Sequence, residues 1–280
     1  MNDHNRGEFR MKCPNCGAES NASAAFCPSC GAPLGQDRGS AVPEAAKTAA
    51  ATGLLLGKKA RMARINAAVD PDAIISDRAY NGTIVVVLLW GLLINYLLCR
   101  FVGTAIFTIN PIVLLVGYLV LAFAGIIISA KSQNPLISFL GYNLVVIPFG
   151  LIITLMVENY GGLGSDVVTH AFLYTLLIST AMMACVMIAP GFFSKIGGAL
   201  SMVLIGMVIC EVVLLILGVK QIWIDWVVAA IFTLYIGYDI YRSQQYPKTL
   251  DNAVDSALDI YMDIANLFIR ILSILGKRND

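Results

Sequence analysis

The chain has 280 residues, of which 58% are hydrophobic and only 13% charged, and its formal net charge at pH 7 is +1. Soluble domains are about 45–50% apolar and about 25% charged, so this composition excludes an ordinary soluble protein over most of the length. A net charge this close to zero supplies no strong basic field, and no nucleic-acid partner is expected. The first residues, MNDHNRGEFRMK, contain no apolar core, so we expect no cleaved secretory signal.

Two C-x-x-C pairs, each followed by glycine, stand near the start of the chain at Cys13, Cys16, Cys27 and Cys30. Two such knuckles bring four sulfurs to one point, which predicts a tetrahedral Zn²⁺ site; disulfides or idle thiols are the alternatives. All four positions would be ligands, so the metal is expected to be structural. Residues 1–34 resemble the zinc-ribbon modules at the ends of many bacterial membrane proteins. Metal-bound thiols favour a reducing compartment, here the cytosol.

Residues 35–79 are predicted to be a flexible linker, because their first part is rich in alanine, glycine and serine. The linker ends in a basic segment that carries Lys58, Lys59, Arg61 and Arg64. This segment either lies on anionic lipid headgroups or forms an ordinary solvated helix.

From residue 80 onward, apolar runs of about 20 residues recur, the length that a helix needs to cross a bilayer. They predict six spans, at 83–101, 111–130, 135–157, 167–189, 197–217 and 223–241. Short connections predict a compact antiparallel bundle, and we find no nucleophile–base, phosphate-loop or metalloprotease motif, so we expect no enzyme. Lysine and arginine gather on the side of the N-terminus, which predicts a cytosolic N-terminus.

The last apolar segment, 254–275, carries several charged residues. It is either a seventh span, shielded from lipid by the other six, or a re-entrant or interfacial helix. Asp255, Asp259 and Asp263 recur every four residues and share one helix face, while Asp239 ends the sixth span. Ionisable groups at membrane depth usually face the interior of a bundle.

Two carboxylates that lie close together in a low dielectric cannot both ionise cheaply, so such a pair can share a proton and sense pH. Deprotonated, it offers hard oxygen ligands that suit Ca²⁺. The alternative is a hydrogen bond, or a salt bridge to Arg270, that only fixes packing. Glu211 in the fifth span is a further candidate for an ion pathway, or an acid that hydrogen-bonds a neighbouring helix.

The stretches LYIGYDIYRSQ, starting at Leu234, and ALDIYMDIANLFIRILSILG, starting at Ala257, resemble the two terminal signatures of the Bax inhibitor-1 (transmembrane Bax inhibitor motif) family. The resemblance covers about 80–280. It implies an all-α, seven-helix membrane bundle with a central last helix and a pH-sensitive Ca²⁺ leak, whose paired aspartates correspond to Asp239 and Asp263. The predicted span 111–130 lacks the basic residue that pairs with these aspartates in some relatives, and Arg270 is the candidate substitute.

These observations predict a calcium-leak protein of a bacterial cytoplasmic membrane, gated by Asp239 and Asp263. A second hypothesis is a regulatory membrane protein without transport, which docks through the zinc ribbon on a partner such as a membrane protease. A third is a proton-coupled transporter.

Overall fold

The structure is a computed structural model that describes residues 10–12, 18–21, 69–216 and 222–277. The chain divides into two compact units, 1–52 and 53–280. In the first unit, β1 (Arg10–Lys12) pairs antiparallel with β2 (Glu19–Asn21), with Met11 opposite Ser20. The four cysteines of the predicted zinc site and the basic residues of the linker lie outside the described residues.

The described part of the second unit contains seven long α-helices. They are α3 (Asp77–Phe101), α4 (Pro111–Lys131), α5 (Pro135–Asn159), α6 (Asp166–Ile188), α7 (Pro190–Ile216), α8 (Ile222–Ser243) and α9 (Leu250–Lys277). Two 3₁₀ segments, η1 (Pro71–Ala73) and η2 (Gly103–Thr108), precede and follow α3. The all-α bundle expected from the sequence is confirmed, and four of the six predicted spans match a helix within two residues at each end; α3 begins six residues earlier than predicted and α7 seven.

Local sequence explains where several helices begin. Ser76 caps α3, because its hydroxyl accepts a hydrogen bond from the Ala79 amide at 3.2 Å. Asn134 caps α5 in the same way, through the Leu136 amide at 2.9 Å. Proline, which has no amide hydrogen to leave unsatisfied, opens α4, α5 and α7.

The start of the fifth span differs from the prediction. The fifth span was predicted to begin at residue 197, after a short connection, but α7 begins at Pro190 and runs through the intervening sequence SKIGG. Gly197 stands there because α7 lies close to α8: a Cβ atom at this position would come within 2.2 Å of the Tyr238 ring. The glycine therefore marks a close helix contact and does not break the helix.

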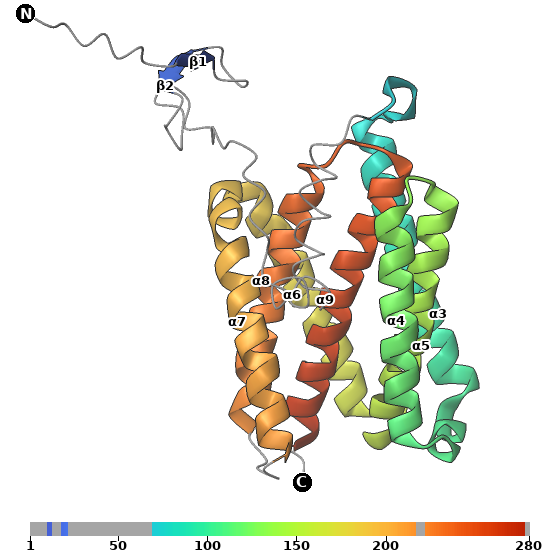
Figure 1. Cartoon of the computed structure of the whole chain (residues 1–280). Helices are drawn as coiled ribbons and strands as arrows, with labels where there is room; N and C mark the ends of the chain where they lie inside the picture. The colour runs from blue at the N-terminus through green and yellow to red at the C-terminus, as the bar shows by residue number, and fades with distance from the viewer. Residues whose placement is uncertain (1–9, 13–17, 22–68, 217–221, 278–280) are drawn as a thin grey trace, which may run out of the picture. The chain divides into compact units, whose positions relative to one another are not determined.

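Helix α9 is the centre of the bundle. It packs against α3 and α5 on one side and α6 and α8 on the other, while α4 packs on α5 and α7 on α8. Figure 1 shows α9, in red, running the length of the bundle between these two groups. The helix is continuous over 28 residues, or about 42 Å. Its central position fits a seventh span that the other helices shield from lipid, rather than a helix on the surface of the bundle.

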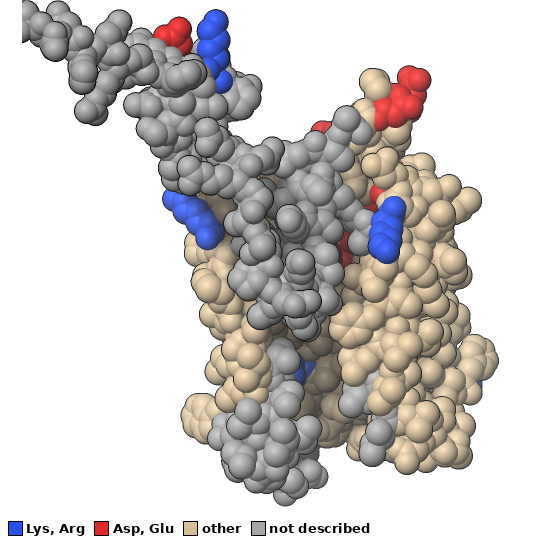
Figure 2. All heavy atoms as spheres, in the orientation of Figure 1, with Lys and Arg blue, Asp and Glu red and all other residues tan. Residues whose placement is uncertain are grey.

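The outside of the bundle is apolar. Within the described residues, α3, α5, α6, the Pro190–Met207 part of α7 and the Trp223–Ser243 part of α8 are long and apolar enough to cross a membrane. The part of α4 from Val116 to Ser129 is a shorter apolar stretch. In the view of Figure 2, the described helices present an almost uncharged surface over their middle height. The chain is therefore a multi-pass membrane protein.

Buried aromatic side chains hold α9 against α3 and α5. The hydroxyl of Tyr261 and the side-chain amide of Asn95 exchange hydrogen bonds of 2.8 and 3.0 Å. Tyr142 lies edge-on to Tyr261 and donates a hydrogen bond to the Val87 carbonyl at 2.9 Å. Gly91 makes room for the Tyr142 hydroxyl, which would lie 2.1 Å from a Cβ at that position.

Candidate functional site

Helices α8 and α9 bring the site together. They are antiparallel neighbours, joined by a turn at residues 244–249, so the end of α8 lies beside the first half of α9. On α8, Asp239 and Arg242 are three residues apart and share a face. On α9, Asp259 and Asp263 are four residues apart and also share a face.

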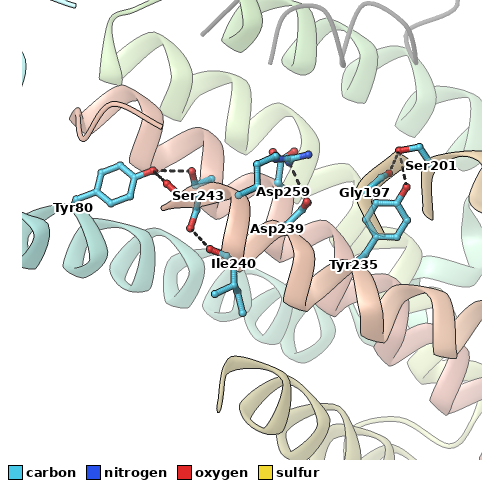
Figure 3. Close-up of polar contacts among 10 residues, drawn as sticks. Tyr80, Gly197, Ser201, Tyr235, Asp239, Ile240, Ser243 and Asp259 are labelled. Atoms are coloured by element: carbon cyan, nitrogen blue, oxygen red, sulfur yellow. Dashed lines mark hydrogen bonds and ion pairs between the residues drawn. The ribbon is translucent and has the colours of Figure 1, made fainter. Parts of the chain in front are cut away.

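The guanidinium group of Arg242 bridges the two helices. Its Nη2 atom lies 2.6 Å from Oδ2 of Asp259 on α9 and 3.1 Å from Oδ1 of Asp239 on its own helix. Its Cζ atom lies 5.3 Å from the centre of the Tyr238 ring, a distance at which a cation is attracted to the ring face. Figure 3 shows Asp239 and Asp259 approaching each other from α8 and α9. The side chains of Arg242 and Asp239 are only 9% and 5% exposed, so water screens this contact weakly.

Asp263 completes the cluster. Its carboxyl group interacts with that of Asp239, and it is 7% exposed. Two buried carboxyl groups this close cannot both ionise cheaply, so such a pair can share a proton. The second oxygen of Asp263, Oδ2, is buried and has no hydrogen-bond partner among the described residues. The cluster thus contains a carboxylate oxygen that is available to a further ligand.

Two more carboxyl groups of α9 point to the opposite group of helices. The hydroxyl of Ser129, at the end of α4, donates to Asp255, and that of Ser138, at the start of α5, donates to Asp251. Both aspartates are buried. The first half of α9 and the end of α8 therefore bring five carboxyl groups together, four of them buried and Asp259 partly exposed.

Three of the residues predicted from sequence meet as expected: Asp239, Asp259 and Asp263 lie in one cluster. Arg270 does not act as their counter-ion. It lies further along α9, where its Nη1 atom binds Asp225 of α8 at 2.9 Å and Ser273 donates to the same carboxylate. Arg242 takes the place that was expected for Arg270.

The sequence analysis missed both Arg242 and Asp225 as partners in the bundle. The available signal for Arg242 was its three-residue spacing from Asp239, which permits a contact within one helix. Glu211 lies in α7, but its side chain is outside the described residues.

The cluster is not a preformed metal cage. Among the described residues, no three side chains of histidine, cysteine, aspartate or glutamate are placed so that they could hold a metal ion together. The charge that neutralises the carboxylates in this structure is the guanidinium group of Arg242.

Comparisons with known proteins place the chain in a family. A family model described as "Inhibitor of apoptosis-promoting Bax1" (Bax1-I) matches residues 77–280, and a model for a zinc-ribbon domain matches residues 12–34. An uncharacterised protein of Helicobacter pylori strain J99 is 31% identical over 166 residues, which cover 58% of this chain and 70% of the relative. An uncharacterised protein of H. pylori strain 26695 is 32% identical over 128 residues, which cover 45% of this chain and 54% of that relative. Because the Bax1-I model spans all seven long helices, the chain belongs to the Bax1-I (Bax inhibitor-1) family.

Proposed function

We propose that the protein is a pH-sensitive leak pathway for Ca²⁺ or a related cation, gated by the Asp239–Asp263 pair. The observation that carries this proposal is the buried contact between the two carboxyl groups beside Arg242, in which Oδ2 of Asp263 lacks a hydrogen-bond partner among the described residues. Burying a charged group is costly without a partner, so a buried acid of this kind at membrane depth supports an ion pathway.

Arg242 would act as an internal counter-ion that closes the path. Its guanidinium group lies between Asp239 and Asp259, the position where a passing cation would bind carboxylate oxygens. A cation can enter only if Arg242 moves away from one of them. Because Arg242 belongs to α8 and Asp259 to α9, a local separation of the two helices would break the contact between them.

Loss of the shared proton would supply the force for that separation. It replaces a hydrogen bond between Asp239 and Asp263 by the repulsion of two charges, about 4 kcal/mol at 4 Å and an effective dielectric constant of about 20. Raising the pH through the titration of the pair should therefore loosen α8 from α9 and add a negative charge that attracts cations. Among the described residues, no three acidic, histidine or cysteine side chains could hold a metal ion together. This fits a path through which a cation passes better than a site that binds it tightly, because conduction requires weak binding.

We propose three parts for the chain: a zinc ribbon at 1–34, a linker with a basic juxtamembrane segment at 35–79, and the transmembrane domain at 80–280. The match to a zinc-ribbon model and the β1–β2 hairpin, whose strands flank the first cysteine pair in the sequence, support the ribbon. Cys13, Cys16, Cys27 and Cys30 would hold a structural Zn²⁺. The N-terminus would then lie in the cytosol, and the bundle in the cell membrane.

A second candidate function is regulation of another membrane protein without transport. The zinc-ribbon match and the separate compact unit at 1–52 favour it, since a module of this kind can serve as a docking site. A pull-down from detergent-solubilised membranes, with wild type beside Cys13→Ser, tests this reading. Loss of specific partners in the variant supports it, and an identical set of partners counts against it.

The leak is tested by Ca²⁺ entry into liposomes that contain the purified protein. We expect the double variant Asp239→Asn/Asp263→Asn to abolish or lock the leak, because neither amide can exchange a proton. Asp166→Asn, at the start of α6, is the matched control and should leave the leak unchanged. A leak equal to wild type in the double variant, in protein shown to be folded, rejects the proposal.

A further inference from the structure

The turn between α8 and α9, residues 244–249, is held from outside by the start of α3. The Ile75 amide donates a hydrogen bond to the Lys248 carbonyl at 2.8 Å, and Gln244 donates one to the Asn81 side chain at 2.9 Å. Lys248 Nζ lies 3.1 Å from Oδ1 of Asp77. Residues from the segment that leads into α3 and from its first turns thus contact both ends of the turn.

Tyr80 is the buried centre of these contacts. Its side chain is completely buried, and its hydroxyl donates to the Ser243 carbonyl at 2.9 Å while lying 3.0 Å from Oγ of Ser256. Ser243 is the last residue of α8, where backbone carbonyls have no partner within the helix, so the Tyr80 hydroxyl satisfies a group that would otherwise be buried alone. Lys248 Nζ lies 5.5 Å from the centre of the Tyr80 ring.

The two groups that Tyr80 joins are directly connected to the carboxylate cluster. Ser243 follows Arg242 in α8, and Ser256 precedes Asp259 by less than one turn of α9. Figure 3 shows Tyr80 beside Ser243, with Asp259 and Asp239 further along the same pair of helices. One hydroxyl therefore fixes the two helices next to the Arg242–Asp259 contact that joins them.

We propose that the start of α3 is a latch that holds the α8–α9 hairpin closed around Arg242 and its carboxylates, with Tyr80 as its positioning residue. The latch consists of Ile75, Asp77, Tyr80 and Asn81. Releasing it lets the ends of α8 and α9 separate while the aromatic contacts of α9 with α3 and α5 remain. The N-terminal part of the chain is covalently joined to the latch, so a partner that moves this part would act on the hairpin first. That releasing the latch would let a cation pass rests on the proposed function; that the latch holds α8 and α9 together does not.

Hydrogen–deuterium exchange of the full-length protein in lipid nanodiscs tests the latch. In Tyr80→Phe we expect the amides of residues 240–256 to exchange about 5- to 30-fold faster than in wild type, because a buried carbonyl loses its partner. Amides at the α5–α6 connection, residues 157–166, should not change. Tyr96→Phe is the matched control: it lies on the same helix, its side chain is 55% exposed, and exchange in the hairpin should stay as in wild type.

Lys248→Gln gives a second, milder test. Its contact with Asp77 is partly exposed, so exchange in residues 240–256 should rise by less than about 5-fold and in the same amides. Unchanged exchange in the hairpin of both variants overturns the latch, as does a rise of equal size in all helices, which would mean a loss of global stability only. A local rise without any cation leak in any variant rejects the cation path and supports the latch.

Discussion

At the scale of single residues, Arg242 is expected to contribute more to stability than the other charged residues of the site. An exposed ion pair contributes about 0–1 kcal/mol, so the contact of Lys248 with Asp77, whose side chain is 81% exposed, does little for stability. Arg242 is different, because it is buried and touches two carboxylates at once. Removing one member of such a set leaves buried charge without its partner, which is far more costly than losing an exposed pair.

We therefore predict that Arg242→Gln lowers the free energy of unfolding by about 3–5 kcal/mol, because the carboxylates of Asp239 and Asp259 then lose their counter-ion. Thermal unfolding in detergent measures the effect. Arg78→Gln, an exposed position on α3, is the control and should change stability little. Adding Asp259→Asn to Arg242→Gln should restore part of the loss. Equal unfolding midpoints for Arg242→Gln and Arg78→Gln would contradict the role of the guanidinium group.

Sequence reasoning identified the acids of this site better than their counter-ion. The four-residue spacing of Asp259 and Asp263 defines one face of a helix, and a costly buried charge must face the interior, so the acids could be predicted. Arg242 stood at the end of a span, where arginine usually marks the cytosolic flank. Whether such a residue points to water or back into the bundle depends on the neighbouring helix, and periodicity carries no information on that neighbour.

At the scale of elements, the interface between α8 and α9 has a charged contact at each end. Arg242 of α8 reaches Asp259 of α9, and Arg270 of α9 reaches Asp225 of α8. Asp225 and Asp239 are 14 residues apart on α8, or about 21 Å. The Arg270 contact thus fixes the far end of the pair, which lets the end with Asp263 open without separating the helices altogether.

The packing of α3 against α5 and α9 leaves no room for a larger side chain at Gly91. Gly91→Ala is predicted to destabilise the bundle by about 1–3 kcal/mol, because the new methyl group would overlap the Tyr142 hydroxyl and touch Tyr261. Gly82→Ala on the same helix is the control. No atom lies within 4 Å of its built Cβ, so removing a helical glycine should stabilise by about 0.5–1 kcal/mol. Thermal unfolding of the two variants measures both effects, and shifts in the same direction would contradict this packing.

The helices themselves were predictable, because apolar runs of bilayer length and short connections leave few alternatives. The exception was α7, where two adjacent glycines were taken for a loop. Glycine has two uses that look alike in sequence, a turn and a close helix contact, and only the Tyr238 ring next to Gly197 distinguishes them. The central position of α9 was predicted from the family resemblance. It agrees with the need to shield the aspartates of α9 from lipid.

At the scale of the whole molecule, the described helices are mostly apolar on the outside, while a set of charged residues is buried between them. Large apolar side chains cover the outer helices, while Arg242 and aspartates of α8 and α9 are buried between the helices. Lipid accounts for the outer surface. The buried charges cost free energy, and the cation path that we propose along α9 would explain why they lie there.

The most direct test of this account is the pH dependence of Ca²⁺ entry into liposomes, from pH 5.5 to 8.5, with wild type beside Asp263→Asn. The account predicts a wild-type leak that rises with pH, as the shared proton leaves the Asp239–Asp263 pair, and a leak in Asp263→Asn that no longer depends on pH. Because asparagine and aspartic acid have nearly the same shape, the comparison isolates the proton. A pH dependence of the leak that is the same in both proteins would contradict the account.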